Sequence, residues 1–182
     1  MVLITLDRVL VIVLGNVLVT IFSDGSFNFL RKSGGWAVFV ESERGKIERY
    51  GATPSFVHCS NHAELFAVYM GLALAYQEWG SDIHAFRVQS DSQCALKHVA
   101  KGPLRSTVRN RGMLRIRAKI LNTYKRCGVQ VLTEHVKGHQ DPTLGLKFAL
   151  NNKVDHMATR GRKTQDGPGF MDMEEVQRLW ML

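Results

Sequence analysis

The sequence contains little cysteine and little proline. It has three cysteines and four prolines among its 182 residues. Cys59, Cys94 and Cys127 are too few and too scattered for a disulfide framework or a zinc site, so we expect a reducing, cytoplasmic location. The chain is 45% hydrophobic and 22% charged, as ordinary folded domains are, which excludes disorder, collagen and coiled coil as descriptions of the whole chain.

The sequence also lacks a long, unbroken hydrophobic run. The most apolar stretch, residues 9–22, is interrupted by Gly15 and Asn16 and is shorter than the roughly 20 residues that a membrane-spanning helix needs. Its many β-branched residues favour two strands joined by a tight turn at Gly15-Asn16. A signal peptide and an N-terminal membrane tether are the alternatives, although no small-residue cleavage site follows. We therefore expect no membrane partner.

Acidic residues are missing from the whole segment 92–133. The net charge of the chain is +8. The cations of this segment outnumber that excess, so the remainder of the chain is slightly acidic; they are Lys97, Lys101, Arg105, Arg109, Arg111, Arg115, Arg117, Lys119, Lys125 and Arg126. A solvated helix face normally mixes both signs. The segment therefore favours contact with a phosphate backbone, and a merely solvated basic helix is the alternative.

The pattern of apolar residues predicts an α/β domain with a five-stranded mixed sheet, three antiparallel strands followed by two parallel ones, flanked by helices. The expected strands are 17–22, 35–40, 45–53, 83–89 and 129–136, and the expected helices are 60–79, 92–100, 107–126 and 149–160. We expect one domain over residues 1–160, with 1–16 as an extra apolar segment. Residues 161–182 are expected to form a tail, mobile over 161–169 and with a short helix over 173–180.

Four acids stand where structure alone has little use for them. Asp24 closes the first of the three antiparallel strands, and Asp91 closes the fourth strand. Glu64 is expected in the first turn of a buried helix, and Asp155 lies in the helix over 149–160. Each alone has an ordinary explanation as a turn residue, a helix-terminal charge, a helix cap or a surface ion-pair partner. Together they would crowd like charges at one sheet edge, which is unfavourable unless divalent cations neutralise them. Oxygen ligands select Mg²⁺ or Mn²⁺.

Five short motifs carry a resemblance to a known family. In chain order they are Phe22-Ser-Asp24-Gly-Ser, Asn61-His-Ala-Glu64-Leu, Ser90-Asp91-Ser-Gln93, Val136-Lys-Gly-His139 and Asn151-Asn-Lys-Val-Asp155-His-Met-Ala158. Their order, spacing and expected elements resemble type 1 ribonuclease H over roughly residues 17–160. Members of that family hydrolyse the RNA strand of RNA–DNA hybrids.

The resemblance implies an endonuclease that leaves 3′-hydroxyl and 5′-phosphate ends. Asp24, Glu64, Asp91 and Asp155 would bind two Mg²⁺, with Mn²⁺ as a substitute. His139 would serve as a general histidine in a mobile loop. The residues implied to contact the substrate, an RNA–DNA hybrid, are Ser60, Asn61, Gln93 and Asn151, and Arg109, Arg111 and Arg115 are expected to contact its backbone. A monomer is expected.

The sequence departs from the family pattern in two places near the expected site. The loop after the first acid usually carries a Gly-Asn-Pro-Gly run, and here it is Phe27-Asn-Phe-Leu-Arg-Lys-Ser33. Cys59 and Ser60 stand near the positions of a usual Thr and Asn, which points to a weaker or differently built DNA-phosphate contact. Two other functions stay open: a related nuclease of the resolvase or integrase type acting on DNA, and a hybrid-binding module with a decayed site.

Overall fold

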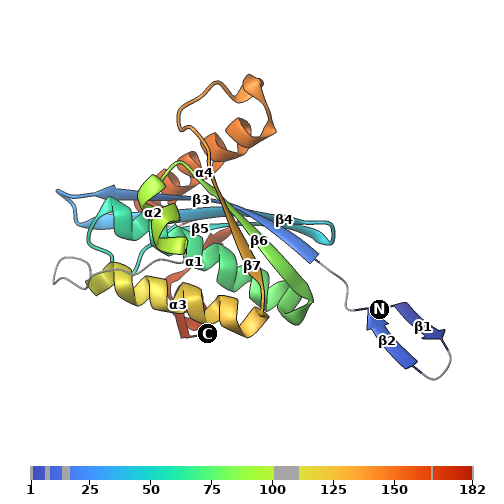
Figure 1. Ribbon diagram of the computed structural model, residues 1–182. Coiled ribbons are helices and arrows are strands. Elements are labelled where there is room, and N and C mark those ends of the chain that lie inside the picture. The colour runs from blue at the N-terminus through green and yellow to red at the C-terminus, as the bar shows by residue number, and fades with distance from the viewer. Residues whose placement is uncertain (1, 7–8, 14–16, 101–110, 165, 182) are drawn as a thin grey trace.

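The centre of the molecule is a six-stranded mixed sheet (Figure 1). The computed structural model describes residues 2–6, 9–13, 17–100, 111–164 and 166–181. The strands of this sheet are β3 (Val17–Asn28), β4 (Ser33–Ser42), β5 (Gly45–Ala52), β6 (Ile83–Ser90), β7 (Gln130–His135) and β8 (Phe170–Met171). Their order is β7-β6-β3-β4-β5-β8, with β3, β4 and β5 antiparallel and β6 and β7 parallel to β3.

Helices cover both faces of the sheet (Figure 1). On one face lie α1 (Ser60–Trp79), α2 (Gln93–Val99), α3 (Arg111–Cys127) and α5 (Met173–Met181), and on the other lies α4 (Leu146–Lys163). Short 3₁₀ turns occupy Gly80–Asp82 and Pro142–Leu144. The split follows the two-residue period of the strands, because Val19 and Ile21 face α1 whereas Phe22 faces α4.

Helix α1 is buried on nearly all sides, as the ring of apolar residues around it predicts. It fills the space between the sheet and α3 with Leu65, Phe66, Val68 and Met70, all without exposed surface. Gly71 allows this close contact, since a Cβ there would lie 2.6 Å from Cγ2 of Ile21. The middle of α1 is thereby packed closely against β3.

The C-terminal segment differs from the expected five-stranded domain with a tail. Helix α4 runs three residues past the expected end, to Lys163, and β8 adds a sixth strand parallel to β5. The Gly-rich stretch is anchored, because the Tyr50 amide donates to the carbonyl of Gly169 and the Tyr50 hydroxyl donates to that of Asp166. The expected last helix is present as α5, and it is docked: Val176, Leu179 and Trp180 belong to the core.

The N-terminal strands also pair differently from the expectation. Strand β1 (Val2–Leu6) pairs antiparallel with β2 (Val9–Val13) in a sheet of their own, so β2 is not the hairpin partner of β3. The expected turn at Gly15-Asn16 lies outside the described residues. In the described part of the chain, no helix is both long and apolar enough to cross a membrane.

Two element boundaries near the expected site are corrected by the structure. Asp24 does not close its strand, because β3 continues to Asn28 and stays paired with β4 as far as Asn28 opposite Ser33. Helix α4 begins at Leu146, three residues before the expected start, after Gly145 with φ of 143°. The first four residues of the expected basic helix over 107–126 lie outside the described residues, and α3 begins at Arg111.

Candidate metal centre

Asp24 lies inside the sheet, on its central strand. Strand β3 is paired on both sides as far as Phe22, where its parallel neighbour β6 approaches its end. From there β3 continues beside β4 alone, so Asp24 lies next to the edge at which β6 stops. The carboxyl ends of parallel strands are where α/β sheets bind ligands. Asp24 is only 7% exposed, which is unusual for an aspartate, and no ion pair between described residues includes it.

Glu64 reaches the same place from the second turn of α1, because the helix begins at Ser60; the expected position in the first turn is therefore wrong. The backbone amide of Gly25 donates a hydrogen bond of 3.1 Å to its Oε2, which ties the helix to the strand. Gly25 itself packs against the helix backbone, since a Cβ there would lie 2.2 Å from the amide nitrogen of Glu64. No side chain fits in that gap, so the Asp24-Gly25 pair is required by packing as well as by any turn preference.

Asp91 follows the last residue of β6 and is held by two neighbours. The side-chain amide of Asn151, on α4, donates to its Oδ2 at 3.4 Å, and the His135 ring lies 3.1 Å from its backbone oxygen. The loop after β7 also passes close to its carboxylate, because a Cβ on Gly138 would lie 2.5 Å from Oδ2 of Asp91. Asp91 is thus the point where β6, α4 and the loop carrying His139 meet.

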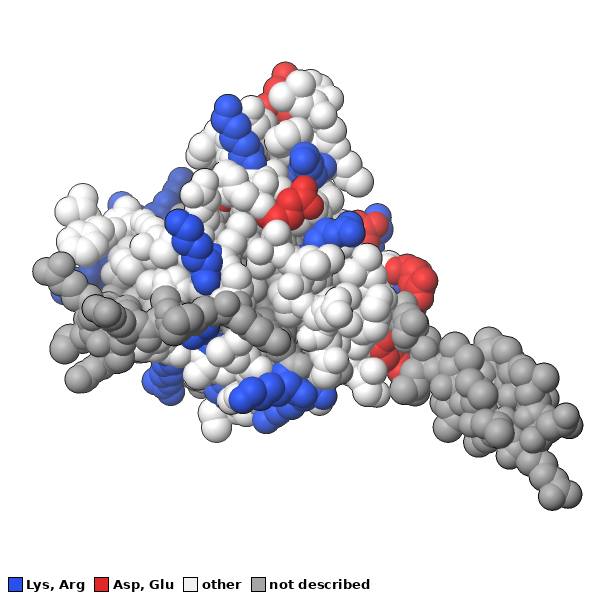
Figure 2. Space-filling view, in the orientation of Figure 1, with Lys and Arg blue, Asp and Glu red and all other residues white. Residues whose placement is uncertain are grey.

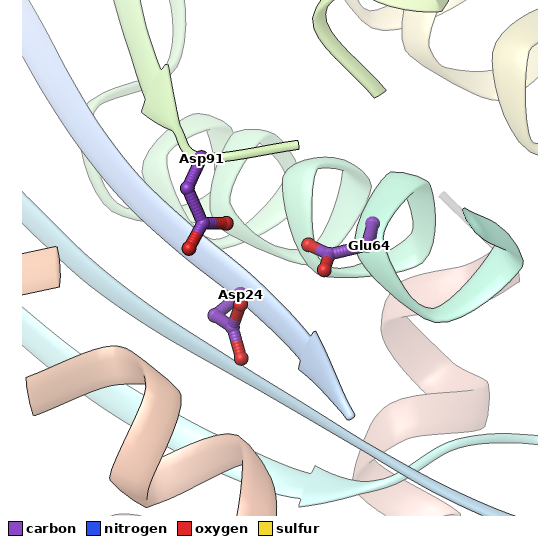
Figure 3. A group of neighbouring side chains, drawn as sticks. All are labelled: Asp24, Glu64 and Asp91. Atoms are coloured by element: carbon purple, nitrogen blue, oxygen red, sulfur yellow. The ribbon is translucent and has the colours of Figure 1, made fainter. Parts of the chain in front are cut away.

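The three carboxylates converge. Asp24, Glu64 and Asp91 each offer a ligand oxygen, and these oxygens lie within 4.8 Å of one another. Figure 3 shows them projecting toward one space from β3, α1 and the segment after β6. Three of the four acids singled out from the sequence are therefore brought together.

Burial and mutual repulsion make this cluster costly to ionise. Burial, together with the nearby charges of Asp91 and Asp155, raises the pKa of Asp24 to about 7 against the lowering effect of the Gly25 amide. The pKa of Glu64 is also raised well above its usual value, first by burial and then by Asp24 and Asp91. Among the described residues, no cation acts on either carboxyl. A bound cation would supply the missing opposite charge.

The fourth predicted acid, Asp155, lies beside the cluster and does not belong to it. It projects from α4 and is half-buried, and its charge acts on both Asp24 and Glu64. One turn before it on α4, Asn151 is 3% exposed, and its Oδ1 has no hydrogen-bond partner among the described residues. The donor set is therefore made of oxygens: carboxylates and one buried amide oxygen. This set suits Mg²⁺ or Mn²⁺ and does not suit soft metals.

His139 follows Gly138 at the rim of the cluster. Its side chain is exposed, and its backbone has a φ of 54°, in the left-handed region that is uncommon for residues other than glycine. Gln140, the next residue, makes two hydrogen bonds in this loop. Its side-chain amide donates to the carbonyl of Gly138, and its own carbonyl accepts from the side-chain amide of Asn152 on α4. The expected loose loop is thus attached to α4, and the sequence analysis did not single out Asn152 or Gln140.

The predicted substrate-contacting residues occupy different positions. Ser60 and Asn61 are exposed at the start of α1, and Gln93 is exposed at the start of α2. Arg115 is exposed on α3, and its guanidinium lies 5.2 Å from the ring centre of Phe56 and 5.6 Å from that of Trp180. Arg109 lies outside the described residues, and the structure describes only the helical position of Arg111.

The acid-free segment forms a basic edge of the molecule. Figure 2 shows Lys and Arg side chains gathered along the lower edge, where Figure 1 places α3. Arg115, Lys125 and Arg126 are exposed there. Lys119 lies over the Trp180 ring beside Arg115, so the tail helix α5 supports part of this edge. The described part of the segment therefore presents cations, as its composition predicts.

Comparisons with known proteins agree with this arrangement. The family model described as RNase H matches residues 16–163. Among curated proteins, no sequence matches the chain. Similar solved structures include RNase H1 of the archaeon Halobacterium salinarum, with 17% identity, a TM-score of 0.59, and coverage of 79% of this chain and 96% of the other.

Two further structures extend the likeness. The N-terminal RNase H domain of Rv2228c from Mycobacterium tuberculosis is 15% identical, with a TM-score of 0.59 and coverage of 81% and 95% of the two chains. LC11-RNase H1, isolated from compost and solved with an RNA/DNA hybrid, is 18% identical, with a TM-score of 0.53 and coverage of 80% and 96%. At these identities the structures establish the fold, and the family match over most of the chain establishes membership. The chain belongs to the RNase H family and is a ribonuclease of the hydrolase class.

Proposed function

We propose that the protein hydrolyses the RNA strand of RNA–DNA hybrids as an endonuclease, leaving 3′-hydroxyl and 5′-phosphate ends. The observation that carries the proposal is the convergence of the buried Asp24 with the half-buried Glu64 and Asp91 at the end of β6, where no ion pair between described residues involves them. A cluster of this kind lowers the stability of the fold unless it binds cations. Its location in an RNase H domain favours phosphodiester hydrolysis over structural metal binding.

Asp24, Glu64, Asp91 and Asp155 would hold two Mg²⁺, which Mn²⁺ can replace. Asp24 is the central ligand in this proposal, because it is buried on the central strand and interacts with all three other acids: the charges of Asp91 and Asp155 act on it, and its own charge acts on Glu64. When bound, two such metal ions activate a water for in-line attack and neutralise charge at the phosphorus centre. The Gly25 amide fixes Glu64, and Asn151 fixes Asp91, so two of the ligands are oriented before any ion arrives.

His139 would move protons at the rim of this centre. An imidazole exchanges protons near neutral pH, and this one is exposed beside Asp91 through the contact of Gly138. The bond from Gln140 to Gly138 and the bond from Asn152 to Gln140 connect its loop to α4. It is not among the ligands that the ions require, and we assign it an assisting role in catalysis.

The exposed amides at the starts of α1 and α2 would read the hybrid. Asn61 lies three residues before Glu64, and Gln93 lies two residues after Asp91, so the two flank the cluster. A side-chain amide both donates and accepts hydrogen bonds, which suits a minor groove lined by 2′-hydroxyl groups. Ser60, beside Asn61, is free to contact the backbone of the DNA strand.

The basic segment would supply sequence-independent affinity. Arg109, Arg111 and Arg115 belong to the stretch without acids, and clustered cations contact phosphates whatever the base sequence. This part of the proposal predicts binding that weakens steeply with salt. That the enzyme is a monomer of the cytoplasm also stays a prediction, and light scattering on the purified protein checks the oligomeric state.

The competing function is a nuclease of the resolvase or integrase type that cuts DNA with a similar set of acids. The two are separated by incubating the protein with an end-labelled RNA–DNA hybrid, a DNA duplex and an RNA duplex, each with Mg²⁺ and with a chelator. We expect Mg²⁺-dependent cleavage of the RNA strand of the hybrid alone. Preferential cleavage of the DNA duplex would favour the competitor, and binding of the hybrid without cleavage under all conditions would indicate a decayed site.

A further inference from the structure

The β3–β4 turn exposes two large apolar side chains next to the proposed substrate site. Phe29 is 80% exposed and Leu30 is 94% exposed, and they are the most exposed hydrophobic residues of the described chain. The turn is ordered by its own hydrogen bonds, from the Arg31 amide to Oδ1 of Asn28 and from the Lys32 amide to the carbonyl of Phe29. Exposed aromatic groups on a fixed turn commonly mark a binding surface.

A cavity of about 510 Å³ opens beside this turn. It lies between the turn and the segment that leads into α1, and its lining residues are Phe27, Phe29, Lys32, Ser55, Val57 and His58. The two sides are joined by backbone contact, because the Thr53 amide donates to the carbonyl of Gly34. Phe27 is packed against the core and forms a fixed wall, whereas Phe29 is a free-standing one.

The surroundings of the cavity are positively charged. Both stretches of chain that form it lack acids, since no Asp or Glu occurs over residues 25–40 or over residues 49–63. Lys32 contributes an ammonium group to the lining, and Arg31 is exposed next to it. Two aromatic rings together with a cation and no acid are the elements with which proteins bind an unpaired nucleotide, the base stacking on the rings and the phosphate meeting the cation.

The cavity is close to the metal centre along the chain on both sides. Phe27 lies three residues beyond Asp24 on β3, or about 10 Å at about 3.4 Å per residue. His58 lies six residues before Glu64 and three before Asn61. The cavity is separate from the acid cluster, because none of the three clustered acids is among its lining residues.

We propose that this cavity binds one unpaired nucleotide of a single-stranded extension of the substrate, with the base against Phe29 and Phe27 and its phosphate at Lys32. The proposal rests on the proposed function only in that the extension belongs to a hybrid. It predicts that hybrids with a short single-stranded end bind more tightly than blunt ones. Stacking one base on an aromatic side chain gives roughly a tenfold gain in affinity.

The test measures binding by fluorescence anisotropy with a chelator present, so that no cleavage occurs. The ligands are a blunt hybrid and hybrids of the same sequence with three unpaired nucleotides, of DNA or of RNA, at either end. The proteins are the wild type, Phe29→Ala and Leu30→Ala. Leu30 is the matched control, because it is on the same turn and even more exposed but does not line the cavity.

We expect the wild type and Leu30→Ala to prefer one extended hybrid about tenfold, and Phe29→Ala to lose that preference while binding and cleaving the blunt hybrid normally. The extension that is preferred identifies the strand and the polarity of the nucleotide. Equal binding of blunt and extended hybrids by the wild type would overturn the proposal and leave the proposed function intact. An equal loss of the extension preference in Phe29→Ala and Leu30→Ala would also overturn the proposal. Self-association that Phe29→Ala abolishes, without any extension preference in the wild type, would overturn it too and would make the turn a protein contact. Failure to bind or cleave the blunt hybrid would instead count against the proposed function.

Discussion

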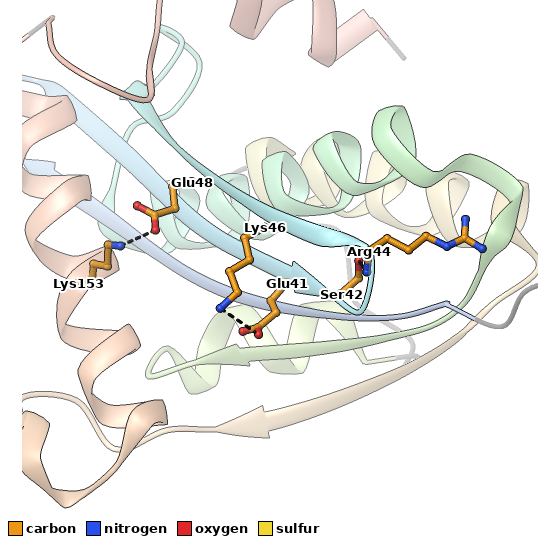
Figure 4. A network of polar contacts seen from close by, with 6 residues as sticks. All are labelled: Glu41, Ser42, Arg44, Lys46, Glu48 and Lys153. Atoms are coloured by element: carbon orange, nitrogen blue, oxygen red, sulfur yellow. Dashed lines mark hydrogen bonds and ion pairs between the residues drawn. The ribbon is translucent and has the colours of Figure 1, made fainter.

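Two groups of acids near the sheet differ in whether they have a cationic partner. At the edge near α4, Glu48 pairs with Lys153 at 2.5 Å and Glu41 pairs with Lys46 at 3.4 Å (Figure 4). These acids are partly exposed, and each has a cation beside it. At the end of β6, Asp24, Glu64 and Asp91 lie together (Figure 3), and none of the ion pairs between described residues includes any of them. Acids with a neighbouring cation contribute to stability, whereas the three clustered acids are arranged to bind a cation.

The difference has an energetic meaning. Exposed ion pairs contribute little, typically up to about 1 kcal/mol, and removing one changes the fold only slightly. Buried like charges instead oppose folding, and the raised pKa values of Asp24 and Glu64 record that cost. The comparison therefore predicts that removing an acid from the cluster stabilises the metal-free protein and inactivates the enzyme, whereas removing a paired acid does neither.

The largest expected effect is that of Asp24→Asn. It should lower hybrid cleavage roughly a thousandfold or more, because the ions supply several kcal/mol of transition-state stabilisation. It should also raise the melting temperature in chelator at pH 8, since one of the mutually repelling charges is gone. Steady-state kinetics and calorimetry check the two effects. Glu48→Gln is the matched control and should leave turnover unchanged; near-normal turnover in Asp24→Asn would remove the metal-site assignment.

An intermediate effect is expected for His139→Ala. The imidazole moves protons beside the ions and is not one of their ligands, so kcat should fall by roughly 10–100-fold, at the low end of general acid–base effects, with KM nearly unchanged. Measured pH–rate profiles from pH 6 to 9 provide the test. Loss as severe as that of Asp24→Asn would make the histidine a direct ligand or participant, and no loss at any pH would remove it from the mechanism.

The basic segment should control affinity more than turnover. Replacing Arg109, Arg111 and Arg115 together by Ala should raise KM much more than it lowers kcat. The slope of log K against log salt should shrink by about 0.9 for each lost phosphate contact on B-form DNA, with a similar magnitude on a hybrid. Arg115→Ala alone serves as the control for folding, because its stacking on Phe56 and Trp180 also contributes to stability. An unchanged salt slope in the triple variant would mean that the segment faces solvent.

The smallest effect is expected in the paired region. Lys153→Ala breaks the pair with Glu48 and also removes the ammonium group that lies 5.4 Å from the Phe39 ring centre. The Lys153 side chain is partly exposed in both contacts, so the free energy of unfolding should fall by no more than about 1 kcal/mol, and activity should be unchanged. Denaturant unfolding and the hybrid assay provide the measurements. A large loss of activity would show that the two regions are not independent.

Much of this arrangement could be predicted from the sequence because it depends on local patterns. Alternating apolar residues gave the five main strands, and polar residues at strand ends and in buried helices pointed to Asp24, Glu64 and Asp91. The sixth strand could not be found that way, because Phe170–Met171 is two residues long and is held by long-range pairing with β5. The same holds for the loop of His139, which Asn152 pins from a separate helix. Such contacts depend on how distant elements meet, and no periodicity records them.

The extent of β3 was also hidden for a physical reason. Its outer half carries polar residues, Ser26 and Asn28, which look like a turn after Asp24-Gly25. Pairing with β4 keeps this half extended, and Arg162 on α4 donates to Oγ of Ser26. The polar pattern therefore marks the rim of the site and not the end of the strand.

The most direct test of the cation claim is the free energy of unfolding as a function of pH, measured for the wild type and Asp24→Asn with chelator and with Mg²⁺. The pKa of Asp24 is raised from 3.8 to about 7, so the folded protein binds this proton more tightly than the unfolded chain. The stability contributed by that proton is present at low pH and is lost as pH rises from about 4 to about 7, by up to about 1.4 kcal/mol per pH unit. His62 and His98 have lowered pKa values and act in the opposite direction, and they cancel in the difference between the two proteins.

We predict that, in chelator, the wild type loses stability relative to Asp24→Asn over this range, and that Mg²⁺ restores it at pH 8 in the wild type only. Parallel curves for the two proteins, or no effect of Mg²⁺ on the wild type at pH 8, would contradict the account.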